Sequence, residues 1–482
     1  MHAGRFVPFI AGRSIDDPAL VTLEVPDPST GAVFAEVALG EAEHANAAVR
    51  AARAAFVAPS WRDLGLSDRS QALHGVAEVL DRHCDELADL DVHTAALSPT
   101  SARWGIRAAA AQFRYYAGLV DKLEGATIPV GPHVLNYSVW EPLGVTVHIL
   151  PSNSPIYLFG RSVAAALAAG NTAVVKPAEQ TTPSAVRFVQ LLADAHVLPD
   201  GVLNVVPGTG SVVGEALLRH PEVAEITFTG SVPVGRHVMQ RAAERVCPVV
   251  LELGGKAPNI VFGDADLERA IPAAVRGAFD RAGQVCVARS RLLVHERLHD
   301  EVIARVSAAS GRLRIGRAVD EPEVGPLITR ALAARVADFV EIGRKEGAEL
   351  VQGGSVPDDA RLAGGFFYRP TVFAGVRPEM RIAREEIFGP VLSVLTFADD
   401  DEAIALANAV PYGLYAEVWT NDLRRAHRVA ARIESGRVGI NGDVVAPQVP
   451  SGGFKESGIG IEKGLLGIRN YLRLKTVSVM LD

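Results

Sequence analysis

From about residue 144 to residue 230 the sequence alternates apolar runs with helix-like segments, and this alternation constrains the fold more than any other feature. Four of the runs are almost continuously apolar, at 145–150, 172–175, 202–206 and 225–228. Strands read this way when helices cover both faces of a parallel sheet and leave neither face to water. The sequence therefore predicts an α/β fold with a doubly wound parallel sheet.

A second alternating region runs from about residue 258 to residue 448. Its strand-like segments lie at 258–262, 290–294 and 389–397, with helical patterns between them. This separate pattern predicts a second α/β domain. Before both regions, alanine-rich segments at 41–57 and 67–96 place apolar residues three and four positions apart, which predicts amphipathic helices.

Two further segments, 135–140 and 471–479, alternate polar and apolar residues as half-exposed strands do. Open edge strands tend to pair with other chains. We therefore expect these two segments to pair and to dock on another subunit, in a homodimer or a homotetramer.

Charge and cysteine content exclude several function classes. The formal net charge of −8 gives no basic surface for nucleic acid or an anionic membrane. No apolar stretch has the length of a membrane span, and the first six residues lack the apolar core of a secretory signal, so we expect a cytoplasmic protein. The three cysteines, Cys84, Cys247 and Cys286, form no CxxC or metal-ligand spacing, so we expect neither a disulfide nor a bound metal.

Cys286 lies in a setting that suggests chemistry. It follows a glycine turn in Gly283-Gln284-Val285-Cys286, and Glu252 precedes it between two leucines. A thiolate can form a covalent acyl intermediate, and a carboxylate can activate the water that breaks it. This pairing favours acyl chemistry through a thioester. The alternative for a cysteine among apolar residues is simple burial, which we expect for Cys84 and Cys247.

Turns that contain glycine or proline follow the strands of the first region. They are Lys176-Pro177-Ala178-Glu179, Gly208-Thr209-Gly210 and Gly230-Ser231. Ligands of parallel α/β sheets bind at the carboxyl ends of the strands, where glycine lets the backbone approach phosphate. The chain has no GxGxxG, so any dinucleotide fingerprint differs from the common one.

Together the motifs resemble those of the NAD(P)-dependent aldehyde dehydrogenase superfamily, and they occur in the order and spacing of that family. The resemblance covers nearly the whole chain. The matching segments are Glu141-Pro142-Leu143-Gly144-Val145, Lys176-Pro177-Ala178-Glu179, Phe228-Thr229-Gly230-Ser231, Leu251-Glu252-Leu253-Gly254-Gly255-Lys256, Gly283-Gln284-Val285-Cys286, Glu386-Ile387-Phe388-Gly389-Pro390, Gly452-Gly453 and Ser457-Gly458-Ile459-Gly460. The resemblance implies a dinucleotide-binding domain of residues 1–121 and 143–254, a catalytic domain of 255–447, and an oligomerisation region of 122–142 and 448–482.

The resemblance also implies a mechanism. Cys286 would attack the aldehyde carbon, and the Asn153 amide with the Cys286 backbone N–H would hold the oxyanion. Hydride would pass to the nicotinamide, and Glu252 would activate the water that hydrolyses the thioester to a carboxylic acid. The alternative for Glu252 is a structural salt bridge at a strand end.

Cofactor contacts follow from the same resemblance. Lys176 and Glu179 correspond to contacts with the adenosine ribose, and Glu386 and Phe388 to contacts with the nicotinamide ribose. A carboxylate at Glu179 would repel the extra phosphate of NADP, so NAD is expected. NADP stays possible because Lys176 could offset the repulsion. The remaining expected contacts are Ser152, Gly210, Phe228, Gly230, Ser231 and Leu253.

Several departures from the family pattern bear on the substrate. Ser154 and Ser451 stand where many relatives have a pocket phenylalanine, so we expect a roomier and more polar tunnel. Arg161 stands where many have an aromatic residue, and could pair with a distal carboxylate or phenolate, or instead form a salt bridge within its helix. Asp280 replaces the second arginine of relatives that oxidise semialdehydes.

These departures favour an aromatic or bulky polar aldehyde, on whose ring Tyr157 could stack. The expected lining of the tunnel is Ser154, Tyr157, Arg161, Val285, Val287 and Ser451. A semialdehyde of a dicarboxylic acid is the alternative. A coenzyme-A-acylating enzyme is less expected, because such relatives usually lack the carboxylate at Glu252. Intact Cys286, Glu252, Asn153 and Lys176 argue against a catalytically silent structural protein.

Overall fold

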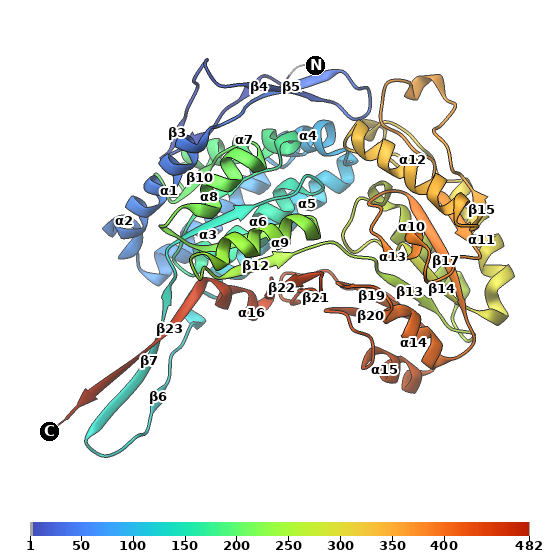
Figure 1. The fold of residues 1–482 in the computed structure, drawn as a ribbon. Helices are drawn as coiled ribbons and strands as arrows, with labels where there is room; N and C mark the ends of the chain where they lie inside the picture. Colours follow the sequence, from blue (N-terminus) through green and yellow to red (C-terminus); the bar gives the residue numbers. More distant parts are fainter. Residues whose placement is uncertain (1–2, 482) are drawn as a thin grey trace.

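The computed structural model describes residues 3–481. The first two residues of the chain, on which the expected lack of a secretory signal partly rests, lie outside that range. Two sheets with separate cores carry most of the helices, and an arm of strands projects away from them (Figure 1). No helix within residues 3–481 is long and apolar enough to cross a membrane.

The first sheet has eight strands in the order β22-β12-β11-β8-β9-β10-β2-β3. Its five central strands run parallel: β8 (Val145–Ile149), β9 (Thr172–Lys176), β10 (Leu203–Val205), β11 (Val223–Thr229) and β12 (Val249–Glu252). Short antiparallel strands close both edges: β2 (Phe9–Ile10), β3 (Arg13–Ser14) and β22 (Gly458–Ile459). The four apolar runs lie on β8 to β11, which confirms the doubly wound parallel sheet.

Helices cover both faces of this sheet. One core joins the sheet to α3 (Leu66–Arg82), α4 (Cys84–Ala95), α5 (Pro99–Ala117), α6 (Pro155–Ala168) and α7 (Thr182–Asp194). The other core contains α1 (Ala42–Val57), α8 (Glu215–Arg219) and α9 (Val232–Ala243). Segment 67–96 thus forms two helices that meet at His83.

The second sheet has seven strands in the order β15-β16-β17-β14-β13-β19-β20. They are β13 (Pro258–Val261), β14 (Arg291–His295), β15 (Glu349–Gln352), β16 (Thr371–Ala374), β17 (Val391–Phe397), β19 (Ala416–Trp419) and β20 (Val438–Ile440). All pairs except β15–β16 are parallel. Its helices are α10 (Leu267–Phe279), α11 (His299–Gly311), α12 (Arg330–Lys345), α13 (Arg381–Arg384), α14 (Asp400–Asn408) and α15 (Leu423–Ala430).

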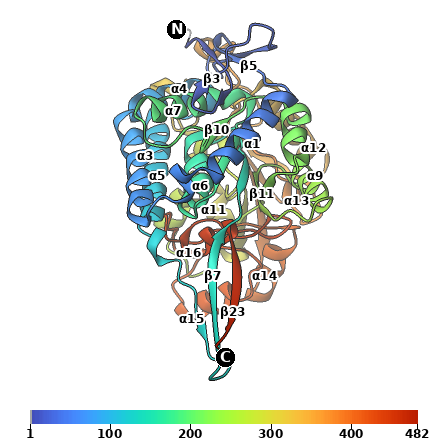
Figure 2. The same ribbon diagram turned by 90° about the vertical axis from the view of Figure 1, so that its left-hand side faces the viewer.

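The arm is formed by β7 (Val134–Pro142) and β23 (Leu472–Met480), which pair antiparallel along their full lengths. Figure 2 shows the two strands extending side by side from the body of the protein. β6 (Thr127–Ile128) adds to β7, so β23 is an edge of this sheet. The predicted pairing of the two segments is confirmed, and their docking on a second subunit stays a prediction.

The C-terminal segment before the arm returns to the first sheet. β21 (Phe454–Lys455) pairs with β18 (Tyr412–Gly413), and β22 pairs with the end of β12. A bridge between Ser451 and Glu462 closes this segment before α16 (Gly464–Ile468). Residues 451–463 therefore lie against the carboxyl end of β12. At the other end of the chain, β1 (Arg5–Phe6), β4 (Thr22–Pro26) and β5 (Val33–Ala38) form a small separate sheet.

Candidate active site

The chain reverses its direction across the first sheet at β8. From β8 it continues to β9 and β10 on one side, and then returns to β11 and β12 on the other. The crevice at such a switch point, outside the carboxyl ends of the strands, is the usual ligand site of an open α/β sheet. The segments that follow β8 and β11 at this crevice contain Ser152-Asn153 and Gly230-Ser231.

Cys286 lies in the loop between α10 and β14 and is half-buried. Two glycines let this loop pack closely against its surroundings. A Cβ atom at Gly283, where φ is +74°, would lie 2.2 Å from the carbonyl oxygen of Gly389. A Cβ atom at Gly255 would lie 2.3 Å from the carbonyl oxygen of Cys286 itself. Both glycines are therefore required by the close approach of backbone around the thiol.

Gln284 fixes the same loop from inside. Its Oε1 accepts a hydrogen bond from the Ile328 N–H at 2.8 Å, and its Nε2 donates to the carbonyl oxygens of Arg281 (2.9 Å) and Pro326 (3.2 Å). The side chain is buried, so these bonds are protected from water. The thiol of Cys286 is therefore presented by a rigid loop.

Asn153 connects the crevice to this loop. Its buried side-chain amide donates from Nδ2 to the carbonyl oxygen of Gln284 at 2.9 Å. A primary amide has two N–H donors, so the second can serve an oxygen atom bound beside Cys286. The structure thus brings Asn153 to the nucleophile loop, while its role with an oxyanion stays a prediction.

Glu252 is the last residue of β12 and is buried. Its Oε2 lies 2.9 Å from Nη2 of Arg161, which also forms an ion pair with Glu462 through Nε. Oε1 of Glu252 has no hydrogen-bond partner within residues 3–481. The salt bridge considered for Glu252 is present, and it leaves one carboxylate oxygen free. The ion pairs of Arg161 reach β12 and the C-terminal segment, so the expected alternative of a salt bridge within its own helix is wrong.

Burial controls the protonation of the site. It raises the pKa of the Cys286 thiol to about 11, an effect that Arg161 opposes and that the charges of Glu252 and Glu386 increase. Burial also raises the pKa of Glu462 to about 7, because the attraction of Arg161 does not compensate for lost hydration and for repulsion by Glu252. The thiol is therefore protonated at neutral pH and must lose its proton to a base when it attacks.

The residues expected to contact a cofactor lie around the crevice. Nζ of buried Lys176 donates to Oε1 of Glu179 at 3.1 Å, and the Glu179 side chain keeps 24% exposure. A Cβ atom at Gly210 would meet nothing within 4 Å, so the backbone there is open to a ligand. Ser231 is the N-cap of α9 and does not use its side chain to cap it, which leaves first-turn N–H groups for a phosphate. Open backbone at Gly210 and free N–H groups at the start of α9 are features that suit the phosphates of a dinucleotide.

The remaining expected cofactor residues flank this crevice. Glu386 accepts from the Gly255 N–H at 3.1 Å, and burial raises the pKa of its carboxyl. Phe388 adopts a φ of +61° just after it. Phe228 belongs to β11 and packs closely against Gly230. A Cβ atom added at Gly230 would lie 2.4 Å from the Phe228 ring. Leu253 is buried directly after β12.

Arg281 lies next to Ser154, the expected tunnel residue at the start of α6. Oγ of Ser154 accepts from Nη1 of Arg281 at 2.5 Å, and the Arg281 guanidinium lies 5.7 Å from the Trp104 ring centre. Trp104 in turn packs on Tyr157, with ring centres 5.3 Å apart. The small side chain of Ser154 therefore does not simply leave open space, because Arg281 lies against it.

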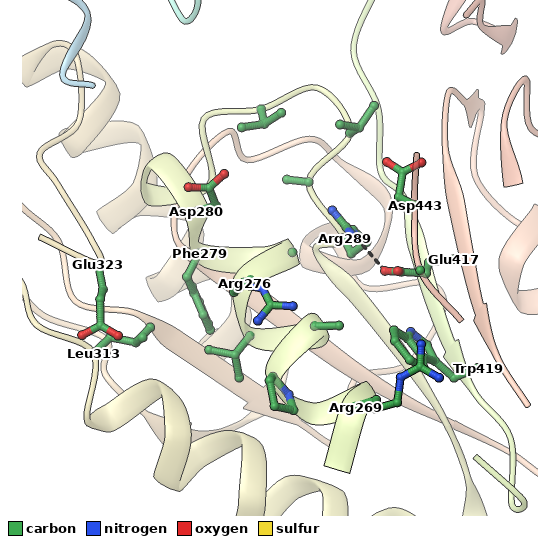
Figure 3. A pocket seen from close by; sticks show the side chains of 18 of the residues that line it. Arg269, Arg276, Phe279, Asp280, Arg289, Leu313, Glu323, Glu417, Trp419 and Asp443 are labelled. Atoms are coloured by element: carbon green, nitrogen blue, oxygen red, sulfur yellow. Dashed lines mark hydrogen bonds and ion pairs between the residues drawn. The ribbon is translucent and has the colours of Figure 1, made fainter. Parts of the chain in front are cut away.

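A cavity of about 920 Å³ reaches the nucleophile loop from the outside. Val285 and Val287, the neighbours of Cys286, both line it, as does Asp443. Figure 3 shows Asp280 and Asp443 on opposite sides of the cavity, and Arg289 paired with Glu417 on the side of Asp443. The cavity then continues over α10, so it gives a path from the surface to the loop.

Sequence reasoning missed several residues that the fold brings to the site: Trp104, Arg281, Arg437, Glu462 and Lys463. Trp104, Arg437, Glu462 and Lys463 come from segments that reach the site only through tertiary packing, whereas Arg281 lies in the same loop as Cys286, a few residues before it. One weak signal existed, since Glu462-Lys463 is a charged pair inside the short glycine-rich segment 458–464. Charged residues in such a segment that turn out to be buried are candidates for a site.

Comparison with known proteins decides the family. The sequence model of the aldehyde dehydrogenase family matches residues 16–477. The chain belongs to the aldehyde dehydrogenase family. An aldehyde dehydrogenase from Bacillus cereus, solved as an NAD⁺ complex, superposes with a TM-score of 0.96 at 38% sequence identity, covering 99% of this chain and 97% of that one. The expected fold and enzyme class are thereby confirmed.

Two curated relatives of this aldehyde dehydrogenase have known substrates in their names. A hydroxyisobutyraldehyde dehydrogenase of Mycolicibacterium austroafricanum is 40% identical over 481 residues, 98% of this chain and 94% of that protein. A betaine aldehyde dehydrogenase of Bacillus subtilis is 41% identical over 473 residues, 97% of this chain and 96% of that protein. These names differ in the charge of the aldehyde, so the family alone does not define the substrate.

Proposed function

We propose that the protein oxidises an aldehyde to the carboxylic acid with NAD, through a thiohemiacetal and then a thioester on Cys286. The observation that carries this proposal is the carboxylate of Glu252. It lies close enough to raise the pKa of the Cys286 thiol by its charge, and its buried Oε1 has no partner in the described part of the chain. A free buried carboxylate oxygen beside a thiol is suited to take a proton.

The chain's own residues divide the work. Cys286 Sγ gives up its proton to solvent and bonds to the aldehyde carbon, and the oxygen becomes an oxyanion that would accept from Asn153 Nδ2 and the Cys286 N–H. NAD, when bound, supplies the acceptor for the hydride that leaves this carbon. The carbonyl re-forms as a thioester. Glu252 then takes a proton from water, the water oxygen attacks the thioester carbon, and the thiolate of Cys286 leaves from the acid product.

The use of NAD is supported by the crevice and by the relative from Bacillus cereus, which was solved with NAD⁺. Glu179 would accept hydrogen bonds from the adenosine ribose, with Lys176 beside it, and Gly210 and the N-terminus of α9 would face the phosphates. Glu386 and Phe388 would face the nicotinamide ribose.

For the substrate, the wall of Tyr157 and Trp104 supports an aromatic or bulky polar aldehyde. A dicarboxylic semialdehyde is the second candidate, which the positive charge near the tunnel favours. A coenzyme-A-acylating reaction is disfavoured because the unpaired carboxylate oxygen of Glu252 would supply a base for water. The arm of β7 and β23 supports assembly into a homodimer or homotetramer.

The test is turnover of a panel of aldehydes, followed by NADH absorbance, in wild type and in Cys286→Ala. The variant should lose aldehyde oxidation and keep NAD binding, because the cofactor crevice belongs to other strands. Cys247→Ala removes a thiol remote from the site and should keep full turnover. Retention of more than a few per cent of kcat in Cys286→Ala would refute the covalent mechanism.

A further inference from the structure

Ser154 is the N-cap of α6, yet its hydroxyl does not cap that helix. A serine at this position usually accepts a hydrogen bond from an N–H group of the first helical turn. Here Oγ instead accepts from Nη1 of Arg281 at 2.5 Å. Ser154 is buried, so water competes little for this bond. The hydroxyl of Ser154 therefore joins the start of α6 to the turn that precedes Cys286.

That turn has an unusual backbone. The angle φ is +51° at Arg281, +54° at Ala282 and +74° at Gly283, and residues with a side chain rarely adopt such values. Backbone strain of this kind persists only where the surroundings hold it, and it concentrates at functional sites. The carbonyl oxygen of Arg281 is held by Gln284, whose N–H and Nε2 donate to it at 3.1 and 2.9 Å. The turn is thus fixed through its main chain, and the guanidinium of Arg281 is left for a different task.

Two hydrogen bonds join the residues before α6 to the residues before Cys286. Asn153 Nδ2 donates to the carbonyl oxygen of Gln284 at 2.9 Å, and Arg281 Nη1 donates to the hydroxyl of Ser154, the next residue. A single bond would act as a pivot about which residues 153 and 154 could turn. Two bonds at successive residues fix their orientation. Together they set the direction of the second N–H of the Asn153 amide.

The guanidinium of Arg281 is itself held against an aromatic wall. Its Cζ lies 5.7 Å from the Trp104 ring centre, and the ring centres of Trp104 and Tyr157 lie 5.3 Å apart. Trp104 belongs to α5 and Tyr157 to the first turn of α6, so two helices support the arginine. Contact with an aromatic ring restricts a long, flexible cation. The charge-assisted bond from Arg281 to Ser154 is therefore a fixed link.

We propose that Arg281 is a positioning residue of the active site, which acts through Ser154 to aim the Asn153 amide at the oxyanion formed on the aldehyde. The inference rests on the proposed oxidation of an aldehyde at Cys286. Asn153 stabilises the oxyanion only if its free N–H lies within hydrogen-bond distance of the oxygen during attack. A misplacement on the order of one ångström costs about a hundredfold in rate. Arg281 thus affects the transition state without contacting the substrate.

The test is a double-mutant cycle between Arg281 and Asn153, read as the rate of NADH formation in the first turnover. Arg281→Met keeps an unbranched side chain, removes the donor, and should lower this rate about tenfold or more with little change in KM. Asn153→Ala should lower it about 100- to 1,000-fold. In the Asn153→Ala background, Arg281→Met should cost less than about twofold more, because no amide is left to position. Losses that multiply in the double variant would overturn the proposal.

Three further variants test the link itself. Ser154→Ala removes only the accepting oxygen, with the least risk to folding, and should reproduce the loss seen in Arg281→Met. Combining Ser154→Ala with Arg281→Met should cost no more than either change alone. Arg281→Lys keeps a charged donor and should lose less than Arg281→Met. Arg312→Met, which removes an exposed arginine at the end of α11, should change nothing.

Alkylation of Cys286 by iodoacetamide supplies a readout that needs no oxyanion. The thiolate displaces iodide directly from carbon, so the rate reports the thiol and its access. Arg281→Met and Ser154→Ala should be alkylated within about twofold of the wild-type rate. A change in alkylation as large as the loss of oxidation would show that Arg281 supports the loop instead of Asn153, and would overturn the proposal. Wild-type oxidation by Arg281→Met would overturn it too and leave the proposed oxidation intact, whereas failure of wild type to oxidise any aldehyde would refute the proposed function itself.

Discussion

The guanidinium of Arg161 lies 2.9 Å from the carboxylate of Glu252, and both groups are buried. Because Arg161 also pairs with Glu462, its removal leaves two buried carboxylates without a counter-charge. We expect Arg161→Leu to lose about 3–5 kcal/mol of unfolding free energy and to impair acidic and neutral aldehydes alike. Urea unfolding and kcat/KM on a matched acid and ester check this. A loss confined to acidic aldehydes would instead support the distal-group role suggested by the sequence.

Glu462 should make stability depend on pH in an identifiable window. Burial raises its folded pKa from 4.5 to about 7, so between these values the folded protein holds a proton that the unfolded chain has released. The contribution of Glu462 to the unfolding free energy is therefore largest below pH 4.5. It declines as pH rises toward 7, by at most about 1.4 kcal/mol per pH unit. Glu462→Gln cannot titrate and should flatten this part of the curve of melting temperature against pH. An unchanged slope would show that Glu462 is ionised throughout.

The thiol of Cys286 should react slowly at neutral pH in the free enzyme. Its pKa is raised to about 11, so only a small fraction is thiolate near pH 7. We expect the rate of iodoacetamide inactivation to rise about tenfold per pH unit from pH 7 to 9, with no plateau. Cys286→Ala identifies the modified residue by mass spectrometry. A plateau below pH 8 would mean that another group activates the thiol in the free enzyme.

Cofactor choice should depend on Glu179. Its carboxylate is partly exposed and is held by Lys176, so an extra phosphate on the ribose would meet a negative charge there. Glu179→Gln keeps the shape and removes the charge, and should shift relative kcat/KM toward NADP by about 1–3 kcal/mol. Steady-state kinetics with both cofactors measure the shift. An unchanged ratio would mean that Glu179 does not face the ribose.

Four strands of the first sheet, β8 to β11, and three of the second, β13, β14 and β17, could be predicted because burial on two faces forces continuous apolar runs. The shorter strands at the edges carry too few residues to show such a run. The break at His83 could not, since the apolar spacing continues on both sides of it. Cys286, Glu252 and Asn153 were identified from motifs, and the fold brings them together at the crevice and the loop beside it.

The charged surroundings of these residues escaped prediction for a physical reason. Glu462 and Lys463 reach the site because β22 pairs with the end of β12, and Arg437 because β20 pairs with β19. Such contacts are set by how strands meet in three dimensions, and no local pattern records them. The same contacts give Arg161 its two partners, which its own helix does not provide.

The most direct test of the covalent account is the mass of Glu252→Gln after it is mixed with NAD and an aldehyde that wild type oxidises. The neutral amide cannot take a proton from water, so acylation and one equivalent of NADH should precede a stalled thioester. Intact-protein mass spectrometry should show the chain heavier by one acyl group, lost when Cys286→Ala is combined with the variant. Normal steady-state turnover by Glu252→Gln, with no adduct on Cys286, would contradict the account.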